Sequence, residues 1–419
     1  MTKVLQPSDA AQVVETVAWA VAEEVPLEIA GTATKRGLGR PLLGEHGGEG
    51  NRIIGHTLDL SSLSGVTLYE PEELVLSAGA GTPLAEIEAM VAEQGQQLAF
   101  EPMHMAALYG NDGGTLGGAI ACNLTGPRRI KAGAARDHVL GIQGVSGRGE
   151  AFKSGGRVVK NVTGYDLSKL MTGSYGTLAA LTEITIKVLP ASEKIRTLLV
   201  LGLDDETAER AMTVALNSSH EVSGAAHMPA AVAAQSAVSY ISGAGGAVTA
   251  LRIEGFSPSV AARTEALQEL LGSFGTLEEL HSTNSVKFWQ EVRDVAPFQT
   301  GERPLWPLWR LSAMPSAGAA VVRDIAAALP GAAFYDWGGG LIWYQLDRYV
   351  GDGGAAVIRA ALTQHGGGHA TLVRADDEVR ARVEVFHPQA TALAALSARV
   401  KDSFDPTRVL NPGRMYQGV

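Results

Sequence analysis

Hydrophobic positions near the start of the chain first follow helical and then strand spacing. Valines lie at helical spacing within 8–24, which predicts an amphipathic helix. The short apolar stretch 26–30 predicts a strand that ends at Gly31. A second buried strand is expected at 74–78. A helix is expected to begin near Pro83. Proline is tolerated in a first helical turn, because the N–H that it lacks would form no hydrogen bond within the helix. The chain therefore begins as helix, strand and glycine loop, and then repeats strand, loop and helix.

The pattern changes after Pro190, which we take as a domain boundary because strand interiors tolerate proline poorly. Before it, residues 181–188 alternate apolar and polar side chains as a strand does. After it, strands and helices alternate in two rounds. The expected strands lie at 197–203, 247–254, 308–312 and 340–345, and the expected helices at 207–217, 260–271, 317–329 and 354–362. This order predicts an α+β, ferredoxin-like domain with helices on one face of an antiparallel sheet.

The remaining segments are less regular. Residues 272–303 show no clear period, and we interpret them as an insertion. A last amphipathic helix is expected at 389–403, before a turn-rich tail. The expected division is a first domain at 1–190, a cap domain at 191–404 and a tail at 405–419. A chain of 419 residues agrees with two or three domains of about 150 residues each.

Composition narrows the classes of function. The net charge is −10, and 19% of residues are charged, so no basic surface indicates nucleic acid or anionic lipid as a partner. The single Cys122 excludes an internal disulfide framework, a thiolate zinc site and an iron–sulfur cluster of the chain's own. Acidic residues interrupt the first apolar stretch, so we expect no signal peptide. We expect a cytoplasmic protein, because the single cysteine fits an intracellular compartment. No run of about 18 apolar residues is present that could span a bilayer.

Glycine is the strongest signal, with 50 residues clustered in a few segments. The loop 31–35 follows a strand, and its small residues allow several backbone N–H groups to converge on a phosphate. A tight turn without a ligand remains the alternative. The loop has neither the Gly-x-Gly-x-x-Gly spacing of a dinucleotide fingerprint nor the Gly-Lys-Ser/Thr ending of a P-loop.

A denser glycine segment lies at 113–118, where four of six residues are glycine. Each such glycine costs on the order of 1 kcal/mol in ordering relative to alanine. We therefore expect this backbone to pack directly against a planar or phosphorylated ligand, since a Cβ atom would obstruct that approach. A mobile surface loop is the alternative, although the apolar run 119–121 favours burial.

A third group of glycine-containing segments lies at 155–161, 164–167 and 173–184. The order and spacing of all three groups together are specific. With 31–35 and 113–118, these segments resemble the FAD-binding domain of the vanillyl-alcohol oxidase and p-cresol methylhydroxylase superfamily. The resemblance extends to the family of FAD-binding subunits of bacterial glycolate oxidase through four further motifs at 126–129, 336–339, 367–371 and 411–416. The fold class implied is α+β, with a two-part FAD-binding domain followed by the ferredoxin-like cap domain.

The resemblance implies the residues that bind FAD. The pyrophosphate would lie on Gly31, Thr32, Ala33, Thr34 and Lys35. The extended dinucleotide and its ring would lie along Gly113, Gly114, Thr115, Gly117, Gly118 and Asn123. The adenine and ribose end would lie against Gly173, Gly176 and Ile184, and the tail would return to the flavin through Asn411 and Arg414. No histidine lies within 30–40, so noncovalent FAD is expected unless His104 is recruited.

Other candidates concern substrate, metal and partners. His369 is a candidate base toward the hydroxyl of a hydroxy acid, together with Asp336, and a structural pair is the alternative. Arg128 and Arg129 would clamp a carboxylate or face a partner. His365 and His369 are four apart, but glycines separate them, so a helical metal site is not expected.

The function that the resemblance implies is oxidation of glycolate or a similar 2-hydroxy acid. With one cysteine, the chain cannot hold an iron–sulfur cluster of its own. The resemblance implies that it works beside an iron–sulfur subunit and a homologous FAD-containing subunit, with at most peripheral membrane association through these partners. A free-standing hydroxy-acid oxidase and a non-catalytic assembly subunit with a structural flavin site remain alternatives.

Overall fold

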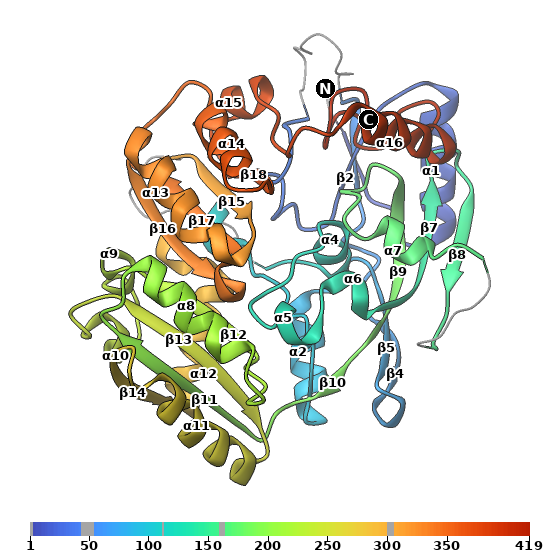
Figure 1. Cartoon of the computed structure of the whole chain (residues 1–419). Coiled ribbons are helices and arrows are strands. Elements are labelled where there is room, and N and C mark those ends of the chain that lie inside the picture. Colours follow the sequence, from blue (N-terminus) through green and yellow to red (C-terminus); the bar gives the residue numbers. More distant parts are fainter. Residues whose placement is uncertain (1–2, 43–53, 111–112, 159–163, 300–305) are drawn as a thin grey trace. The chain divides into compact units, whose positions relative to one another are not determined.

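The computed structural model describes residues 3–42, 54–110, 113–158, 164–299 and 306–419 (Figure 1). The chain forms two compact units. Unit 1 consists of Met1–Leu124, Ala134–Ala191 and Glu384–Val419, and unit 2 of Thr125–Gly133 and Ser192–Val383.

Unit 1 contains two main sheets. The smaller is parallel, with strand order β1(Lys3–Leu5), β3(His56–Asp59) and β2(Leu27–Ala30). The larger is antiparallel, in the order β4(Val66–Glu70), β5(Val75–Gly79), β9(Ala179–Lys187), β7(Val139–Ser146) and β8(Ala151–Gly155). A short pair joins β6(Gln96–Gln97) to β10(Leu189–Pro190). The helices are α1(Ala10–Ala22), α2(Leu84–Glu93), α3(Ala106–Tyr109), α4(Leu116–Ala121), α6(Ala135–His138), α7(Leu167–Met171) and α16(Thr391–Phe404).

Apolar helix faces cover these sheets. Helix α1 buries Val13 and Val17, one turn apart, and the Asp9 carboxylate caps its first turn by accepting the Gln12 N–H at 2.9 Å. These valines share a core with Leu27 and Leu58 of the parallel sheet. Both predicted starting elements therefore exist, because helical periodicity and a good N-cap agree with the tertiary packing.

Unit 2 is built on one antiparallel sheet of eight strands. Their spatial order is β14(Thr276–His281), β11(Lys194–Leu201), β13(Val248–Gly255), β12(Gly224–Met228), β16(Gly331–Asp336), β17(Leu341–Leu346), β15(Leu308–Ser312) and β18(His369–Arg374). The helices are α5(Arg129–Ala132), α8(Asp205–Leu216), α9(Ala230–Ala233), α10(Ser239–Ser242), α11(Ser257–Leu271), α12(Ser282–Arg293), α13(Gly318–Ala328), α14(Ala355–Gln364) and α15(Asp377–Arg382).

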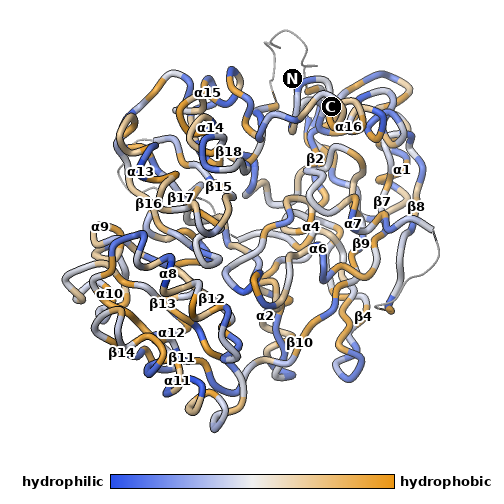
Figure 2. The backbone as a smooth tube through the Cα atoms, viewed as in Figure 1, coloured by the Kyte–Doolittle hydropathy of each residue, from blue (hydrophilic) through white to orange (hydrophobic). Residues whose placement is uncertain are grey.

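The sheet of unit 2 consists of two ferredoxin-like halves. Each half runs strand, helix, strand, strand, helix, strand, and the two meet where His227 of β12 pairs with Tyr335 of β16. Helix α8 buries Ala208, Ala211 and Ala215 on one face, and in Figure 2 its colours change between hydrophobic and hydrophilic along the helix. The rough two-fold rhythm of the sequence corresponds to these two halves.

The structure differs from the sequence predictions in two segments. The interpretation of 272–303 as an insertion is wrong, since β14 within this segment is the last strand of the first ferredoxin-like half, and α12 follows it. The segment Glu384–Val419, with α16, belongs to unit 1, whereas the predicted cap domain reached 404. The buried Lys401 explains this placement, because its ammonium donates to Thr177 O of unit 1 at 2.6 Å. No helix in the described ranges is long and apolar enough to cross a membrane.

Candidate cofactor site

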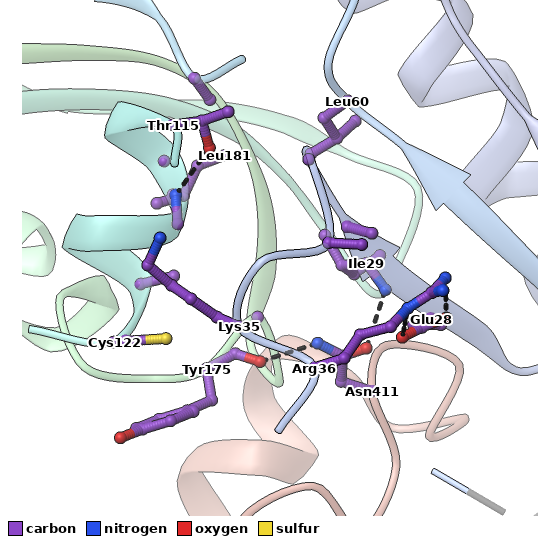
Figure 3. A pocket seen from close by; sticks show the side chains of 18 of the residues that line it. Glu28, Ile29, Lys35, Arg36, Leu60, Thr115, Cys122, Tyr175, Leu181 and Asn411 are labelled. Atoms are coloured by element: carbon purple, nitrogen blue, oxygen red, sulfur yellow. Dashed lines mark hydrogen bonds and ion pairs between the residues drawn. The ribbon is translucent and has the colours of Figure 1, made fainter. Parts of the chain in front are cut away.

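A cavity in unit 1 lies where β2 ends, and about 800 Å³ of empty space belongs to it, part of it open to solvent. Sites for small molecules and cofactors commonly measure about 300–1,000 Å³. Its walls come from the loop after β2, the first turn of α4, the start of β9 and the tail (Figure 3). The lining residues are Glu28, Ile29, Ala30, Gly31, Thr32, Ala33, Thr34, Lys35, Arg36, Leu42, Leu60, Ala80, Thr115, Gly117, Gly118, Ala121, Cys122, Tyr175, Gly176, Ala179, Leu181, Asn411 and Arg414.

The loop after β2 is a series of tight turns. Ala33 has φ +57°, and the Arg36 N–H donates to Ala33 O at 3.2 Å. Gly31 passes close to Thr115, since a Cβ atom on Gly31 would lie 3.0 Å from the Thr115 hydroxyl oxygen. Arg36 is held outside this turn by a two-pronged contact with Glu28, with both N···O distances 2.8 Å. Short side chains therefore keep the loop backbone open toward the cavity.

Helix α4 brings glycine to the opposite wall. Its N-cap Thr115 accepts the Gly118 N–H at 3.2 Å. A Cβ atom on Gly117 would lie 2.8 Å from Ala80 O, so this glycine is required by the protein's own backbone. That the glycine run faces a ligand stays a prediction, and the contact with the turn after β5 is a second reason for glycine at position 117.

Lys35 reaches from the loop to the start of α4, as Figure 3 shows. Its Nζ lies 3.3 Å from the Thr34 hydroxyl oxygen, and no carboxylate of the described residues forms an ion pair with it. Burial lowers the pKa of the Lys35 ammonium below its ordinary value. A partly buried cation without a counter-charge, at a wall of small residues, suits an anionic ligand group.

Cys122 and Tyr175 also line this cavity. Burial raises the pKa of the Cys122 thiol, the effect of the nearby Lys35 and Arg414 being smaller. The thiol is therefore protonated at neutral pH and is a poor nucleophile. Together with Leu60 and Leu181, these side chains supply the mostly apolar surface that a flat ring system needs. The cavity thus fits a dinucleotide, with an apolar part for rings and one ammonium for phosphate.

Many of the predicted FAD-binding residues line this one cavity. These are Gly31, Thr32, Ala33, Thr34, Lys35, Thr115, Gly117, Gly118, Gly176, Asn411 and Arg414. Sequence reasoning missed Leu60, Cys122 and Tyr175, because they come from separate segments and carry no motif, and it ended the loop one residue before Arg36.

The other predicted FAD-binding residues do not line the cavity. Gly113 and Gly114 precede the α4 cap, and a Cβ atom on Gly114 would lie 2.7 Å from Lys35 Nζ. Asn123 accepts the Arg136 N–H through its side-chain oxygen at 3.2 Å. Gly173 donates its N–H to Ile120 O at 3.1 Å, and Ile184 of β9 is buried in the hydrophobic core of unit 1.

The predicted substrate residues lie in unit 2. Arg128 binds the buried Glu254 carboxylate with N···O distances of 2.6 and 3.0 Å. Its guanidinium therefore already holds a carboxylate of its own chain. Arg129 stacks on the Trp337 ring at 4.7 Å. Asp336 is buried, and it accepts the Trp337 N–H at 2.7 Å, which stabilises a turn in which Trp337 has φ +52°.

The histidines have separate positions. His369 is exposed at the start of β18, and His365 contacts Asp324 at 2.8 Å. His104 pairs with Glu88 at 3.1 Å and does not line the cavity. Among the described residues, no group of three or more histidine, cysteine, aspartate or glutamate side chains is arranged to hold a metal ion.

Comparison with known proteins identifies close relatives. The family described as FAD binding domain matches residues 1–155. The glycolate oxidase subunit GlcE of Escherichia coli is 37% identical over 407 residues, covering 96% of this chain and 96% of that protein. The D-lactate dehydrogenase of Archaeoglobus fulgidus is 31% identical over 50% of this chain and 43% of its own length. The glycolate oxidase subunit GlcD of Bacillus subtilis is 44% identical over 21% of this chain and 18% of its own length.

Solved structures support the fold. A p-cresol methylhydroxylase with substrate bound has a TM-score of 0.71 at 14% identity, covering 98% of this chain and 88% of that chain. An alkyldihydroxyacetonephosphate synthase has a TM-score of 0.69 at 15% identity, covering 98% and 76%. These similarities confirm the predicted fold class.

Proposed function

The chain belongs to the family of the glycolate oxidase subunit GlcE, and from this membership we propose that it is an FAD-dependent subunit that oxidises glycolate or a closely similar 2-hydroxy acid. The single observation that carries this proposal is the 37% identity that spans 96% of both proteins. The match is not limited to the FAD-binding part, because it covers nearly the whole of both proteins. The cofactor is FAD.

The cavity of unit 1 is the proposed FAD site. The ammonium of Lys35 and the turns of the loop 31–36 would hold the pyrophosphate, because this ammonium lines the cavity and forms no ion pair with a carboxylate of the described residues. The apolar side chains Leu60 and Leu181 would lie against the rings. Bound FAD supplies a two-electron acceptor for the hydrogen removed from the hydroxy acid. The chain's own contribution is to hold and orient the cofactor.

We propose that this FAD is noncovalent. The thiol of Cys122 lines the cavity, but burial keeps it protonated. His104 pairs with Glu88 and lies outside the cavity lining. Denaturation in acid or urea should therefore release the flavin from the polypeptide.

A further part of the proposal concerns the partner subunits. The relatives GlcE and GlcD are named as subunits, which supports a multi-subunit enzyme. Because Cys122 is the chain's single cysteine, an iron–sulfur cluster that receives single electrons would have to lie in a second subunit. We propose an iron–sulfur subunit and a homologous FAD-containing subunit as partners.

The catalytic groups also remain proposals. His369 is exposed and is the candidate base, whereas the Asp336 carboxylate already caps a turn, which favours a structural role for it. Replacing His369 by alanine should lower the rate of substrate oxidation without lowering FAD content. An equal rate in the His369→Ala enzyme would exclude this histidine as the base.

The test begins with the purified chain alone. Flavin absorption at about 450 nm reports bound FAD. Loss of this absorption after anaerobic addition of glycolate then reports reduction of the flavin. Bleaching of the isolated chain indicates self-sufficient oxidation, whereas bleaching only with co-purified partners indicates the complex. A folded chain that binds no FAD on reconstitution would contradict the proposed function. Bound FAD that glycolate never reduces, with or without partners, would favour an assembly subunit with a structural flavin.

A further inference from the structure

Residues 409–411, near the end of the chain, pair with β2, the strand that leads into residues 31–40. Residues 31–40 are called the FAD loop. The Leu27 N–H donates to Val409 O at 2.7 Å, and the Asn411 N–H donates to Leu27 O at 3.0 Å. The Asn411 side chain accepts the Ile29 N–H at 2.8 Å and donates to Tyr175 O at 2.7 Å. Figure 3 shows Asn411 between β2 and the loop of Tyr175. One side chain therefore joins two walls of the cavity.

Arg414 then binds the FAD loop itself. Its guanidinium donates to Lys35 O and Arg36 O, both at 3.0 Å, and to Arg40 O at 3.3 Å. In return, the Arg40 N–H donates to Arg414 O at 2.8 Å. Arg414 is only 8% exposed, so these contacts form in a partly desolvated place where charge-assisted hydrogen bonds are strong.

A buried ion pair anchors the segment just before these contacts. Lys401 Nζ lies 2.7 Å from the Asp405 carboxylate, and both side chains are fully buried. The same ammonium donates to Thr177 O at 2.6 Å and to Leu410 O at 2.9 Å. Asp405 also accepts the N–H groups of Val409 and Leu410. The ion pair therefore holds the backbone at the start of the segment 409–414.

We infer that residues 409–414 form a latch that sets the conformation of the FAD loop 31–40, with Arg414 as a positioning residue. This inference rests on the proposed FAD site. Three loop carbonyls that share one guanidinium have their partial negative charges compensated, which favours an anionic pyrophosphate beside Lys35. Arg414 acts on the cofactor through the loop, and FAD affinity depends on the latch being closed.

Thermodynamic linkage makes the dependence reciprocal: if the closed latch favours FAD binding, FAD binding must favour the closed latch. Hydrogen exchange of the wild-type chain tests this without any substitution. The amides of Asn411 and Arg40 donate across the latch, so both should exchange more slowly once FAD is bound. Slower exchange in the loop with unchanged exchange at Asn411 would overturn the inference.

Substitutions provide the second test. Arg414→Ala should weaken FAD binding at least tenfold, and Arg414→Lys should recover only part of it, since one ammonium lacks the planar fork of donors. Added guanidinium ion, at concentrations below those that denature the chain, should restore FAD binding to Arg414→Ala but leave the wild type unchanged. Equal dissociation constants for Arg414→Ala and wild type would overturn the inference, as would the absence of rescue.

A matched control is Arg148→Ala. Arg148 also donates to main-chain carbonyls, those of Ser403 and Asp402 in α16, but it makes no contact with the loop. This variant should keep its FAD affinity even if it loses stability. An equal loss of FAD affinity in Arg148→Ala and Arg414→Ala would indicate a general loss of stability and would overturn the latch.

The two proposals can fail separately. If wild type binds FAD and Arg414→Ala binds it equally well, only the latch fails. If a folded wild type binds no FAD, the proposed function fails, and the latch is then tested on the protein without cofactor. There, Arg414→Ala should speed the exchange of the loop amides Leu38 and Arg40, and unchanged exchange would overturn the latch as well.

Discussion

Arg128 holds both carboxylate oxygens of Glu254 in unit 2, although the two residues are 126 positions apart in the chain. Both side chains are nearly buried, with exposed fractions of 10% and 7%. Arg252 Nε lies 3.5 Å from the same carboxylate, and its guanidinium stacks on Trp289. The contact fixes the segment Thr125–Gly133 on the sheet of unit 2, which the sequence interpretation of Arg128 as a substrate ligand did not anticipate.

This cluster predicts a specific pH dependence of stability. The positive charges of Arg252 and Arg128 outweigh the effect of burial and lower the pKa of Glu254 from 4.5 to about 2. Because the folded pKa is depressed, the stabilisation is present above about 4.5 and is lost as the pH falls toward 2. Glu254→Gln should therefore lower the free energy of unfolding at pH 7 by about 3–5 kcal/mol, since two arginines lose their partner.

Urea unfolding between pH 7 and pH 3 measures this difference. The difference in the free energy of unfolding between wild type and Glu254→Gln should become smaller as the pH falls. Glu278→Gln, on the exposed side of β14, is the control and should change stability little at any pH. A gap of constant size from pH 7 to pH 3 would contradict the pKa assignment.

The close approach of Gly117 to the turn after β5 predicts a second outcome. A Cβ atom there would lie 2.8 Å from both Ala80 O and Ala80 Cβ, so Gly117→Ala forces the backbone apart. Overpacking of this kind costs about 1–3 kcal/mol, and the shift of α4 should also reduce FAD content. Thermal unfolding and the ratio of flavin to protein absorbance measure both effects. Gly156→Ala, which has open space around the added methyl group, should be tolerated.

The same glycines show how far the sequence predicts the site. The loop 31–35 and the segment around Thr115 are local signals, because a strand followed by small residues is visible within a few positions. The apolar walls are not visible, since Leu60, Cys122 and Tyr175 come from separate segments that only the fold brings together. The close contact that explains Gly117 likewise depends on the position of Ala80 in space.

The fold shows the same division between local and nonlocal information. Helices with one apolar face, such as α1 and α8, were predicted from spacing alone. Four strands of the sheet in unit 2 were missed: β12, β14, β16 and β18. β12 and most of β16 are buried at successive positions and so give no alternating pattern, whereas β14, at one edge of the sheet, has mostly exposed or partly exposed residues. The assignment of α16 to unit 1 depends on the buried Lys401, which sequence patterns do not reveal.

The ion pair of Lys401 and Asp405 predicts a coupled effect on stability. Lys401→Met leaves the Asp405 charge buried without its cation, and the loss of one partner of a buried pair costs about 3–5 kcal/mol. Asp405→Asn should also destabilise the fold, because the Lys401 ammonium then lacks a counter-charge. The double variant should be less destabilised than the sum of the two, which urea unfolding of all four proteins measures. Simple additivity would show that the two side chains do not interact.

The Lys35 ammonium is expected to favour cofactor binding but to lower the stability of the chain without cofactor. Without FAD, its ammonium has no carboxylate partner among the described residues. Burial of this ammonium lowers its pKa below the ordinary value. A base with a lowered folded pKa binds fewer protons in the folded than in the unfolded state, so its cost to stability decreases as the pH rises toward the ordinary value of 10.5. Lys35→Met removes this cost.

Lys35→Met should therefore keep or raise the melting temperature of the chain without cofactor, yet weaken FAD binding by about 10–100-fold through the loss of a charge-assisted contact of roughly 1.5–3 kcal/mol. Lys169→Met removes an exposed lysine of the same unit and should change neither quantity. Differential scanning calorimetry with and without FAD, together with a flavin titration, measures both. A variant that loses stability without cofactor but binds FAD as wild type does would show that Lys35 is structural and that the pyrophosphate lies elsewhere.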